Sequence, residues 1–487
     1  MDFLEVNNVS KSFGKVKALD GVSFSVGRGE VFGLIGPDGA GKTTLFRLMA
    51  TLLLPDSGSV CVDGFDTVTE MRDIRRRVGY MPGKFSLYQD LTVEENLKFF
   101  ATLFNTTVDE GYDSIKAIYS QIEPFRNRKA GALSGGMKQK LALSCALIHQ
   151  PSVLFLDEPT TGVDPVSRKE LWELLLMLKE RNITIVAATP YLDEIRHCER
   201  VAYLSEGHVQ AIDTPDAVLT QFASVFNPPP VNVDVDVNVR SEDYAIEVSH
   251  LVKAFGTFHA VDDISFKVRK GEIFGFLGAN GAGKTTAMHM LTGLNQPTSG
   301  TGKVSGYDIR TQHEELKKHI GYMSQRFSLY EDLTVAENIR LFAGIYGMSD
   351  DDISRKTDEL LTRLNFTSHR NDLVKSLPLG WKQKLAFSVS IFHDPGVVFL
   401  DEPTGGVDPA TRRQFWELIY EAARQGITVF VTTHYMDEAE YCNRISIMVD
   451  GKISAMGTPE ELKRQYNQPD IDHVFTYLAR QATRSSD

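Results

Sequence analysis

With 487 residues the chain has room for two or three domains, and its formal net charge of -12 argues against a dedicated nucleic-acid binder, which needs clustered Lys and Arg. No apolar stretch is long enough to span a bilayer and the start does not resemble a signal peptide, so we expect a cytoplasmic protein. The scattered cysteines contain no C-x-x-C pair, which predicts neither a disulfide framework nor a zinc or iron–sulfur site: Cys61, Cys145, Cys198 and Cys442.

The same series of motifs occurs twice along the chain. Lys284 lies 242 residues after Lys42 (284 - 42), and Asp401 lies 244 residues after Asp157 (401 - 157). A repeat in near-constant register predicts one domain that has been duplicated. We place the domains at residues 1–226 and 244–470, with a linker at 227–243 and a C-terminal tail at 471–487. The linker is rich in Pro, Val, Asn and Asp; an extra edge strand is the competing interpretation.

Each half opens with Val, Phe and Gly in alternation, at residues 4–26 and 246–268, which predicts antiparallel strands. Phe13 and Phe255 occupy matching positions there. An aromatic ring at this place is suited to stack on an adenine base, and a core aromatic on a strand is equally compatible with the pattern.

A glycine-rich loop follows an apolar, strand-like run in each half, at residues 31–35 and 273–277, and leads into a helix-prone segment. This is the context of a P-loop, whose backbone N–H groups point at phosphate oxygens while its Lys and Thr serve the outer phosphates and Mg²⁺. We therefore predict that nucleotide is bound by Gly36, Pro37, Asp38, Gly39, Ala40, Gly41, Lys42, Thr43 and Thr44, and by Gly278, Ala279, Asn280, Gly281, Ala282, Gly283, Lys284, Thr285 and Thr286.

Two further motifs come next in both halves. Residues 79–83 and 321–325 lead into a shared Phe-Ser-Leu-Tyr phrase and then into Glu-Asn pairs, which we interpret as helix-surface residues. Leu133-Ser134-Gly135-Gly136 matches Leu377-Pro378-Leu379-Gly380 before a helix whose N-terminus could face an anion. Pro378 suits a first helical position, so the helix should survive, but the hydroxyl and the N–H are lost.

An apolar strand then ends in two carboxylates, Asp157-Glu158 and Asp401-Glu402. Charge at the end of a buried strand is costly unless it serves a metal or a reaction. A last apolar strand leads to Thr433-His434 in the second half and to Thr189-Pro190 in the first, so the histidine has become a proline.

These elements in this order resemble the nucleotide-binding domains of ATP-binding cassette (ABC) proteins, twice over nearly the whole chain. The Asp-Glu-Pro-Thr, Gly-Val-Asp-Pro and Thr-His-Tyr-Met-Asp-Glu-Ala-Glu phrases resemble most closely the twin-cassette ATPase subunit of ABC-2-type exporters. The resemblance implies an α/β fold of two tandem P-loop NTPase domains, each with a RecA-like core, an antiparallel β subdomain and a helical signature subdomain. It also implies head-to-tail packing that binds ATP and Mg²⁺ between each P-loop and the signature loop of the opposite cassette.

The resemblance implies one complete site. Glu402 would orient and deprotonate the attacking water, and His434 with the signature donors would stabilise charge on the γ-phosphate. Thr285 and Asp401 would hold Mg²⁺, and Gln325 would link the metal and the water to the transport partner. The signature donors come from the first half: Ser134, Gly135 and Gly136.

The other implied site pairs Glu158 as the catalytic carboxylate with Thr43 and Asp157 as metal ligands, and it departs at three places. Gly83 replaces the glutamine, Pro190 the histidine, and Pro378-Leu379 the signature donors. Losing one transition-state donor lowers a rate by about 10²–10³, so we expect this site to bind ATP but to cleave it poorly. Asp38, where the second half has Asn280, adds negative charge near the phosphates and would weaken the site further.

The resemblance implies separately encoded permease subunits, two in number, and a peripheral place on the cytoplasmic face of the inner membrane. Contact candidates follow Gly83 and Gln325, although buried packing is the commoner fate of such a cluster: Phe85, Leu87, Tyr88, Phe327, Leu329 and Tyr330. The rival function is a soluble twin-cassette factor acting on ribosomes, whose long charged linker and two intact signatures are not found here. A DNA-repair cassette ATPase would need a coiled coil for which the spacing leaves no room.

Overall fold

The computed structural model of the chain describes residues 3–14, 16–83, 87–163, 165–226, 243–279, 281–325, 329–405 and 407–481. It divides into two compact units, Met1–Asn227 with Gly406–Thr411, and Pro228–Gly405 with Arg412–Asp487. The expected linker, including its alternative as an edge strand, lies outside the described residues up to residue 242. None of the helices in the described ranges combines the length and the hydropathy that a membrane span requires.

The first unit contains a four-stranded antiparallel sheet of order β2-β1-β4-β5 and a six-stranded sheet of order β10-β9-β3-β8-β7-β6. The larger sheet is parallel except for β10, which pairs antiparallel to β9. The strands are β1 (Leu4–Phe13), β2 (Val16–Val26), β3 (Val31–Ile35), β4 (Ser57–Val62), β5 (Phe65–Asp66), β6 (Val78–Met81), β7 (Val153–Asp157), β8 (Thr184–Ala188), β9 (Arg200–Ser205) and β10 (His208–Asp213). The α-helices are α1 (Lys42–Met49), α2 (Met71–Arg75), α3 (Val93–Leu103), α4 (Val108–Tyr119), α5 (Gly135–Leu147), α6 (Pro165–Glu180), α7 (Pro215–Gln221) and α8 (Ala223–Phe226), with 3₁₀ helices η1 (Glu123–Phe125), η2 (Ala130–Ala132) and η3 (Glu194–His197).

The second unit repeats this topology, with sheets of order β12-β11-β14-β15 and β16-β17-β18-β13-β19-β20, so the predicted duplication and fold class are confirmed. Its strands are β11 (Tyr244–Phe255), β12 (Phe258–Arg269), β13 (Ile273–Gly278), β14 (Ser299–Val304), β15 (Tyr307–Asp308), β16 (Ile320–Met323), β17 (Val397–Asp401), β18 (Thr428–Thr433), β19 (Arg444–Val449) and β20 (Lys452–Gly457). Its α-helices are α9 (Lys284–Leu291), α10 (His313–Lys318), α11 (Val335–Ile345), α12 (Asp350–Arg363), α13 (Leu379–Ser390), α14 (Pro409–Arg424), α15 (Pro459–Tyr466) and α16 (Ile471–Gln481), with η4 (Thr367–His369), η5 (Val374–Ser376) and η6 (Met436–Tyr441) as 3₁₀ helices.

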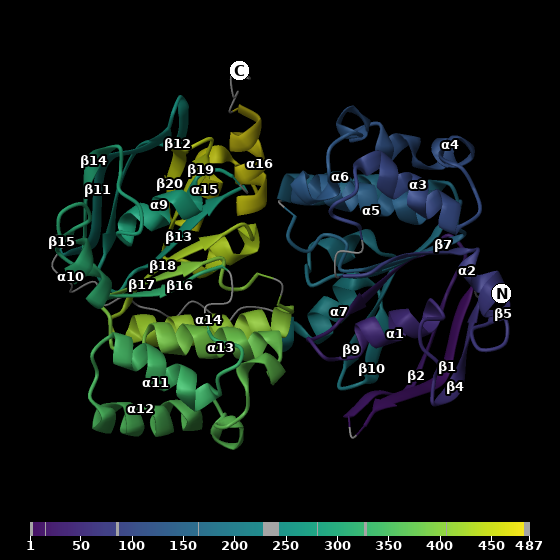
Figure 1. Cartoon of the computed structure of the whole chain (residues 1–487), viewed down its shortest axis with the longest axis horizontal. Coiled ribbons are helices and arrows are strands. Elements are labelled where there is room, and N and C mark those ends of the chain that lie inside the picture. The colour runs from purple at the N-terminus through teal and green to yellow at the C-terminus, as the bar shows by residue number, and fades with distance from the viewer. Residues whose placement is uncertain are drawn as a thin grey trace. The chain divides into compact units, whose positions relative to one another are not determined.

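The six-stranded sheet of each unit separates two apolar cores. Along β17, Val397 and Phe399 join the core beneath the antiparallel sheet, whereas Val398 and Leu400 join the core beneath the helices. Figure 1 shows α11, α12 and α13 on one side of this sheet and β11, β14 and α9 on the other. Because both faces are covered, β3, β7, β13 and β17 consist mainly of apolar residues, and the charged residues of β7 and β17 stand at the carboxyl ends of these strands.

The Glu-Asn pairs differ in part from the prediction of helix-surface residues. Glu95 is exposed and forms a capping box with Thr92 at the start of α3. Asn96 is fully buried, and its side chain bonds to both the backbone N–H and the carbonyl of Tyr88. Asn338 does the same with Tyr330. The amides therefore fix the loop ahead of each helix, which a surface interpretation does not explain.

The segment expected to be a C-terminal tail contains helix α16, which belongs to the core of the second unit. Ile471, Val474 and Phe475 are at most 1% exposed and lie in the same apolar cluster as Tyr441 and Leu462. Their i, i+3 and i+4 spacing forms a stripe along one face of the helix. The polar residues between them misled the sequence interpretation, because only the stripe is buried.

We predict that Phe475→Ala lowers the free energy of unfolding of the second unit by about 3–5 kcal/mol, because the change removes buried apolar surface and leaves a cavity. Tyr477→Ala, on the same helix but 42% exposed, serves as the control and should lower it by about 1 kcal/mol at most. Denaturant unfolding followed by tryptophan fluorescence measures both changes. Equal, small shifts for the two variants would show that α16 is dispensable to the core.

Candidate functional site

Each P-loop joins a buried strand to a helix through a glycine that no other residue can replace. Gly283, just before α9 begins at Lys284, has a left-handed φ of 105°. A Cβ added to it would lie 2.2 Å from the carbonyl oxygen of Ala260. Gly41 has the same φ in the first unit, and its Cβ would lie 2.5 Å from the carbonyl oxygen of Ala18. The two loops therefore share one backbone geometry.

The two P-loop lysines are buried and bonded to their own loops. The Nζ of Lys284 donates to the carbonyl oxygens of Gly278 and Ala279, at 2.7 and 3.1 Å. Lys42 makes the equivalent pair of bonds in its loop, at 2.7 and 3.0 Å. Each ammonium is thus held inside the cradle where nucleotide phosphates are bound in P-loops.

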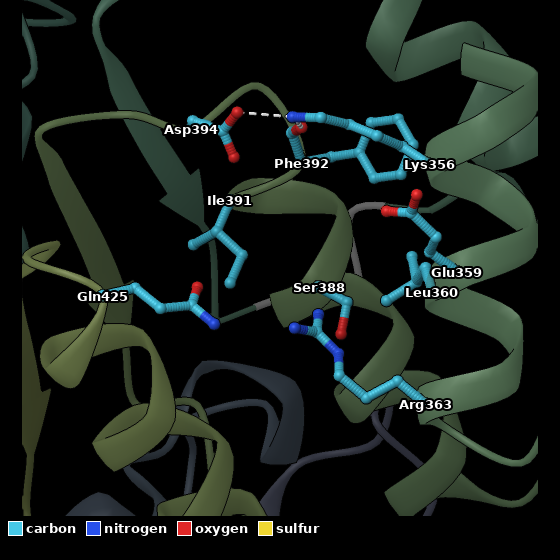
Figure 2. A pocket seen from close by; sticks show the side chains of 9 residues that line it. All are labelled: Lys356, Glu359, Leu360, Arg363, Ser388, Ile391, Phe392, Asp394 and Gln425. Carbon is cyan, nitrogen blue, oxygen red and sulfur yellow. Dashed lines mark hydrogen bonds and ion pairs between the residues drawn. The ribbon is translucent and has the colours of Figure 1, made fainter. Parts of the chain in front are cut away.

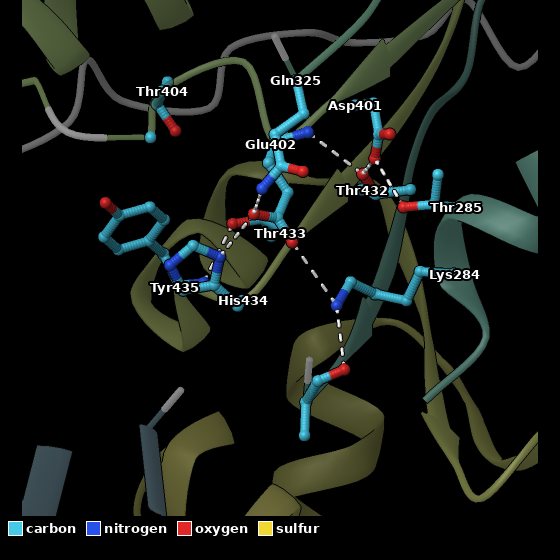
Figure 3. Close-up of polar contacts among 12 residues, drawn as sticks. Lys284, Thr285, Gln325, Asp401, Glu402, Thr404, Thr432, Thr433, His434 and Tyr435 are labelled. Carbon is cyan, nitrogen blue, oxygen red and sulfur yellow. Dashed lines mark hydrogen bonds and ion pairs between the residues drawn. The ribbon is translucent and has the colours of Figure 1, made fainter. Parts of the chain in front are cut away.

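Asp401 ends β17 and lies beside Thr432 of β18, its register partner in the parallel sheet. The Thr432 hydroxyl donates to Asp401 Oδ1 at 2.6 Å, and the Thr285 hydroxyl donates to the same oxygen at 3.4 Å (Figure 3). Burial raises the pKa of Asp401, and the bond from Thr432 opposes that shift. The strand end and the P-loop are in this way tied together at one oxygen atom.

Glu402, the next residue, is surrounded by three polar side chains. Gln325 Nε2 donates to its Oε2 at 2.8 Å, His434 Nδ1 lies 3.0 Å from the same oxygen, and Lys284 Nζ lies 3.5 Å from Oε1 (Figure 3). Burial by itself would raise the pKa of Glu402, but His434 and Lys284 together hold it below its usual value. The carboxylate is therefore kept ionised, which is the form that accepts a proton.

The residues around Glu402 fit a phosphate and a hard metal ion. His434 is 4% exposed, and its Nε2 has no hydrogen-bond partner among the described residues. An unpaired polar nitrogen beside the P-loop lysine fits the oxygen of an incoming phosphate. Thr285 and Asp401 present the oxygen ligands that Mg²⁺ prefers, one or two from protein with the rest from phosphate and water. In the described ranges no three His, Cys, Asp or Glu side chains cluster as an all-protein metal cage.

A buried network lies behind the His434 loop. Glu438 is fully buried, and its carboxylate accepts hydrogen bonds from the hydroxyls of Thr404 and Thr433. The hydroxyl oxygen of Thr433 also accepts a hydrogen bond from the backbone N–H of Tyr435. Arg412 lies 3.6 Å from the Glu438 carboxylate and 4.2 Å from the centre of the Tyr435 ring. The network joins the loop after β17 to the loop after β18.

The first unit contains the same network. Glu194 accepts from the hydroxyls of Thr160 and Thr189, and the Arg168 guanidinium lies 4.0 Å from the centre of the Tyr191 ring. Burial raises the pKa of Glu194 to about 7, against the attraction of Arg168. Because both units keep this network, it positions the loops after the two strands whether the threonine is followed by a histidine, as in the second unit, or by a proline, as in the first.

Glu158 of the first unit has the same backbone conformation as Glu402 but different side-chain partners. Both residues have a left-handed φ, 54° and 47°. Among the described residues, the Glu158 carboxylate accepts a side-chain hydrogen bond from the Thr161 hydroxyl, at 3.1 Å. Burial raises the pKa of Glu158, and the Lys42 ammonium opposes that shift without reversing it. The two glutamates are therefore shifted in opposite directions.

The first-unit replacements lie where the sequence alignment places them. A Cβ added to Gly83 would lie 3.1 Å from the Asp157 carbonyl oxygen and 3.8 Å from the Glu158 Cβ, so a side chain there would begin beside the acidic pair. Pro190 follows Thr189 as His434 follows Thr433. Asn280 lies outside the described residues, whereas Asp38 is exposed.

The structure shows the local surroundings of the predicted signature and aromatic residues within each unit. Ser134 caps helix α5 by accepting a hydrogen bond from the Met137 N–H at 3.4 Å. Helix α13 survives the proline as expected, but Pro378 is its N-cap residue and not its first helical residue. Phe13 and Phe255 are 48% and 56% exposed, so the interpretation as core aromatics is wrong.

The predicted contact segments divide into buried and exposed positions. Leu87 and Leu329 are buried in the helical cores of their units, which is the commoner fate of such residues. Tyr88 and Tyr330 are 50% and 58% exposed. Phe85 and Phe327 lie outside the described residues.

A separate cavity of about 300 Å³ opens between α12 and α13 of the second unit (Figure 2). Lys356, which pairs with Asp394, and Arg363 line it together with Ser388 and Gln425. It shares no residue with the P-loop or with the carboxylates at the end of β17, so it is distinct from the nucleotide site.

Two functional positions escaped the sequence interpretation. Thr432 contacts both acidic residues of the second site, and Ala188 takes its place in the first. The signal was present, because Ala188 aligns with Thr432 at the spacing of 244 that relates the other pairs (432 - 188). Glu438 was also passed over, since nothing in its surroundings along the chain marks it as buried.

The ABC transporter family model matches residues 19–161 and 261–405. The chain is 38% identical over 563 residues to the probable multidrug ABC transporter ATP-binding protein YbhF of Escherichia coli (strain K12), covering 98% of this chain and 97% of that protein. It is 28% identical over 488 residues to the ribose import ATP-binding protein RbsA of Streptococcus agalactiae serotype V, covering 93% of this chain and 95% of that protein. With its two P-loops on two copies of one fold, the chain belongs to the ABC transporter family, as a fused pair of ATP-binding cassettes whose ATPase activity is coupled to transport.

Proposed function

We propose that this chain is the ATP-hydrolysing subunit of an ABC-2-type exporter of drugs or other amphiphiles, acting on two separately encoded permease subunits. The observation that carries the proposal is the group of side chains around Glu402. Its carboxylate is held ionised between Lys284, Gln325 and His434, which is the arrangement that a base acting on water beside a phosphate requires. Similarity favours export, because identity is 38% to the multidrug protein and 28% to the ribose importer.

In the proposed mechanism the two cassettes pair head to tail and bind two ATP molecules. The P-loop that contains Lys284 would receive N–H and hydroxyl donors from Ser134, Gly135 and Gly136 of the first cassette. Ser134 supports this role because it opens α5 with two glycines at its first turn, so the helix N-terminus is accessible to an anion. The exposed Phe255 is then available to stack on the adenine of the same nucleotide, as Phe13 is at the other site.

Residues of the second cassette perform distinct tasks around the γ-phosphate. Lys284 would exchange its carbonyl partners and Glu402 for phosphate oxygens, which leaves Glu402 to accept the proton of the attacking water. His434 would donate its ring N–H to the γ-phosphate, and Gln325 would orient the water. Thr285 and Asp401 would hold Mg²⁺, which would supply positive charge to offset the negative charge of the phosphates.

The first-cassette P-loop would form the weaker site. Lys42 keeps its place in the cradle, so ATP binding is retained. Glu158 has neither an amide at position 83 nor an imidazole at position 190, and its raised pKa disfavours the ionised form that acts as a base. Pro378 and Leu379 offer no hydroxyl from the opposite signature loop. We infer that this site binds ATP and closes the pair while the second site performs most of the hydrolysis.

The permease would dock on apolar side chains that both units expose at matching positions. Such residues recur with a spacing of 242, in the pairs Leu52 and Leu294, Tyr88 and Tyr330, Phe99 and Leu341, and Leu103 and Ile345. In the first unit Leu52 and Leu103 also line a cavity of about 610 Å³. Apolar surface that is repeated in two copies fits a partner that binds each cassette in the same way. The docked chain would lie on the cytoplasmic face of the membrane.

We predict that Glu402→Gln lowers the kcat of ATP hydrolysis by at least about 100-fold, because the substitution removes the ionised base, whereas Glu158→Gln lowers it less than about threefold. Steady-state hydrolysis by the purified chain with its permease measures both. Each glutamine is close in shape to the glutamate it replaces, so nucleotide binding should persist in both variants and serves as the folding control. Equal losses in the two variants would overturn the assignment of one strong and one weak site.

We also predict that the double variant Tyr88→Glu with Tyr330→Glu loses its association with detergent-solubilised membranes, because charge replaces apolar contacts in both copies of the surface. ATPase activity of the isolated chain should be unchanged, since neither side chain contacts the P-loop. Tyr477→Glu, on an exposed face of α16, is the matched control and should still co-purify with the permease. Retention of the double variant on membranes, or sedimentation of the chain with ribosomes instead, would contradict the proposed partner.

A further inference from the structure

Thr432 is the residue at which the two acidic side chains of the second site meet. Its hydroxyl donates to Asp401 Oδ1 at 2.6 Å and accepts from the backbone N–H of Glu402 at 3.0 Å. The carbonyl oxygen of Thr432 accepts a second bond from the same N–H, at 3.1 Å. A hydroxyl that is fully buried must find partners, and this one uses both its donor and its acceptor on the catalytic pair.

Ala188 occupies the equivalent place in the first unit. It pairs with Asp157 across β7 and β8 as Thr432 pairs with Asp401 across β17 and β18. Without the hydroxyl, Oδ1 of Asp157 is buried and has no hydrogen-bond partner in the part of the chain that the structure describes. The Glu158 N–H bonds to the Ala188 carbonyl oxygen alone, at 2.9 Å.

Comparison of the units separates the role of the hydroxyl from that of the backbone. Glu158 reaches the same left-handed φ as Glu402 beside an alanine, so the hydroxyl is not needed to form the turn. Nor is it needed to fill space, because β8 packs with alanine at this position and remains fully buried. What changes between the units is the bond from the neighbouring strand: Asp401 accepts hydroxyl bonds from Thr285 and Thr432. Asp157 accepts from Thr43 and from the Gly83 N–H, and its other, buried oxygen has no partner among the described residues.

We propose that Thr432 is a positioning residue that fixes Asp401 for Mg²⁺ and Glu402 for water, and that Ala188 is a fourth departure that disables the first site. The inference rests on the proposed function for the roles of the two acidic residues. It goes beyond the three departures that the sequence shows, because Ala188 lies inside the sheet and acts only through Asp157 and Glu158. Partners that orient a metal ligand in this way are worth about 10–100-fold in metal affinity or activity.

The test compares Thr432→Val with Thr432→Ser in a Lys42→Ala background, where nucleotide binding reports on the second site. Valine keeps the shape and loses the hydroxyl, whereas serine keeps the hydroxyl and loses the methyl group. In this background we expect valine to raise the Mg²⁺ concentration at half-maximal binding of a fluorescent ATP analogue about tenfold. With Lys42 intact, valine should lower the kcat of ATP hydrolysis by a similar factor with KM little changed. Serine should stay within about threefold of the parent. The thermal midpoints of both variants without nucleotide verify folding.

The opposite pattern would overturn the inference. If valine behaved as the parent and serine did not, Thr432 would serve packing alone. Glu402→Gln, measured in parallel, distinguishes the proposed function from the positioning role of Thr432. If Glu402→Gln lowered kcat strongly and Thr432→Val did not, the proposed function would be supported and the positioning role would be wrong.

The reciprocal change is Ala188→Thr, with Ala188→Ser as a smaller alternative, in a Lys284→Ala background that reports on the first site. A hydroxyl at position 188 should tighten the Mg²⁺ dependence of analogue binding about threefold or more, because it supplies the missing partner of Asp157. Hydrolysis should stay low, since Gly83 and Pro190 remain. An unchanged Mg²⁺ dependence in folded serine and threonine variants would contradict the role given to Ala188.

Discussion

Two adjacent carboxylates at the end of a fully buried strand impose the constraint on which this structure depends. Charge that is removed from water is unfavourable unless it is paired and hydrogen-bonded. In the second unit the partners of Asp401 and Glu402 come from the P-loop, from the neighbouring strand and from the loops that contain Gln325 and His434. Satisfying the pair therefore brings separate segments of the chain to one point. The groups that make the charge tolerable are those that a phosphate and a water molecule need.

The first unit shows how the same fold accommodates the pair with fewer partners. In the first unit, burial raises the pKa of both Asp157 and Glu158. In the second unit, burial raises the pKa of Asp401, but the His434 imidazole and the Lys284 ammonium hold the pKa of Glu402 below its usual value. A carboxyl whose pKa is raised can take up a proton, which reduces the free energy of leaving it unpaired. The fold is kept by other contacts, among them the buried Glu194 network. Stability and ionisation of the base are thus separable in this domain.

The sequence was sufficient to predict the duplication, the sheet-and-loop order and the acidic pair, because each has a short local pattern. It was not sufficient where a role depends on register or on burial. Asn96 looks like any polar residue on a helix, yet it is buried and closes a loop. Thr432 looks like one more residue of an apolar strand, and its role appears only when the parallel register sets it beside Asp401. The burial of helix α16 was not predicted, because four buried side chains are a weak signal within a polar segment.

The distribution of differences between the units favours a division of labour over general decay of the first site. Unselected substitutions would affect residues that maintain the fold as well as residues near the carboxylates, and the residues that maintain the fold are more numerous. The first unit nevertheless keeps the glycine at φ 105°, the folded-back Lys42 and the complete Glu194 network. What it lacks are the groups directed at its carboxylates, at positions 83, 188 and 190. A P-loop that is kept without these groups is what the proposed function requires of the first site, where ATP binding would close two cassettes and cleavage would occur at the other site.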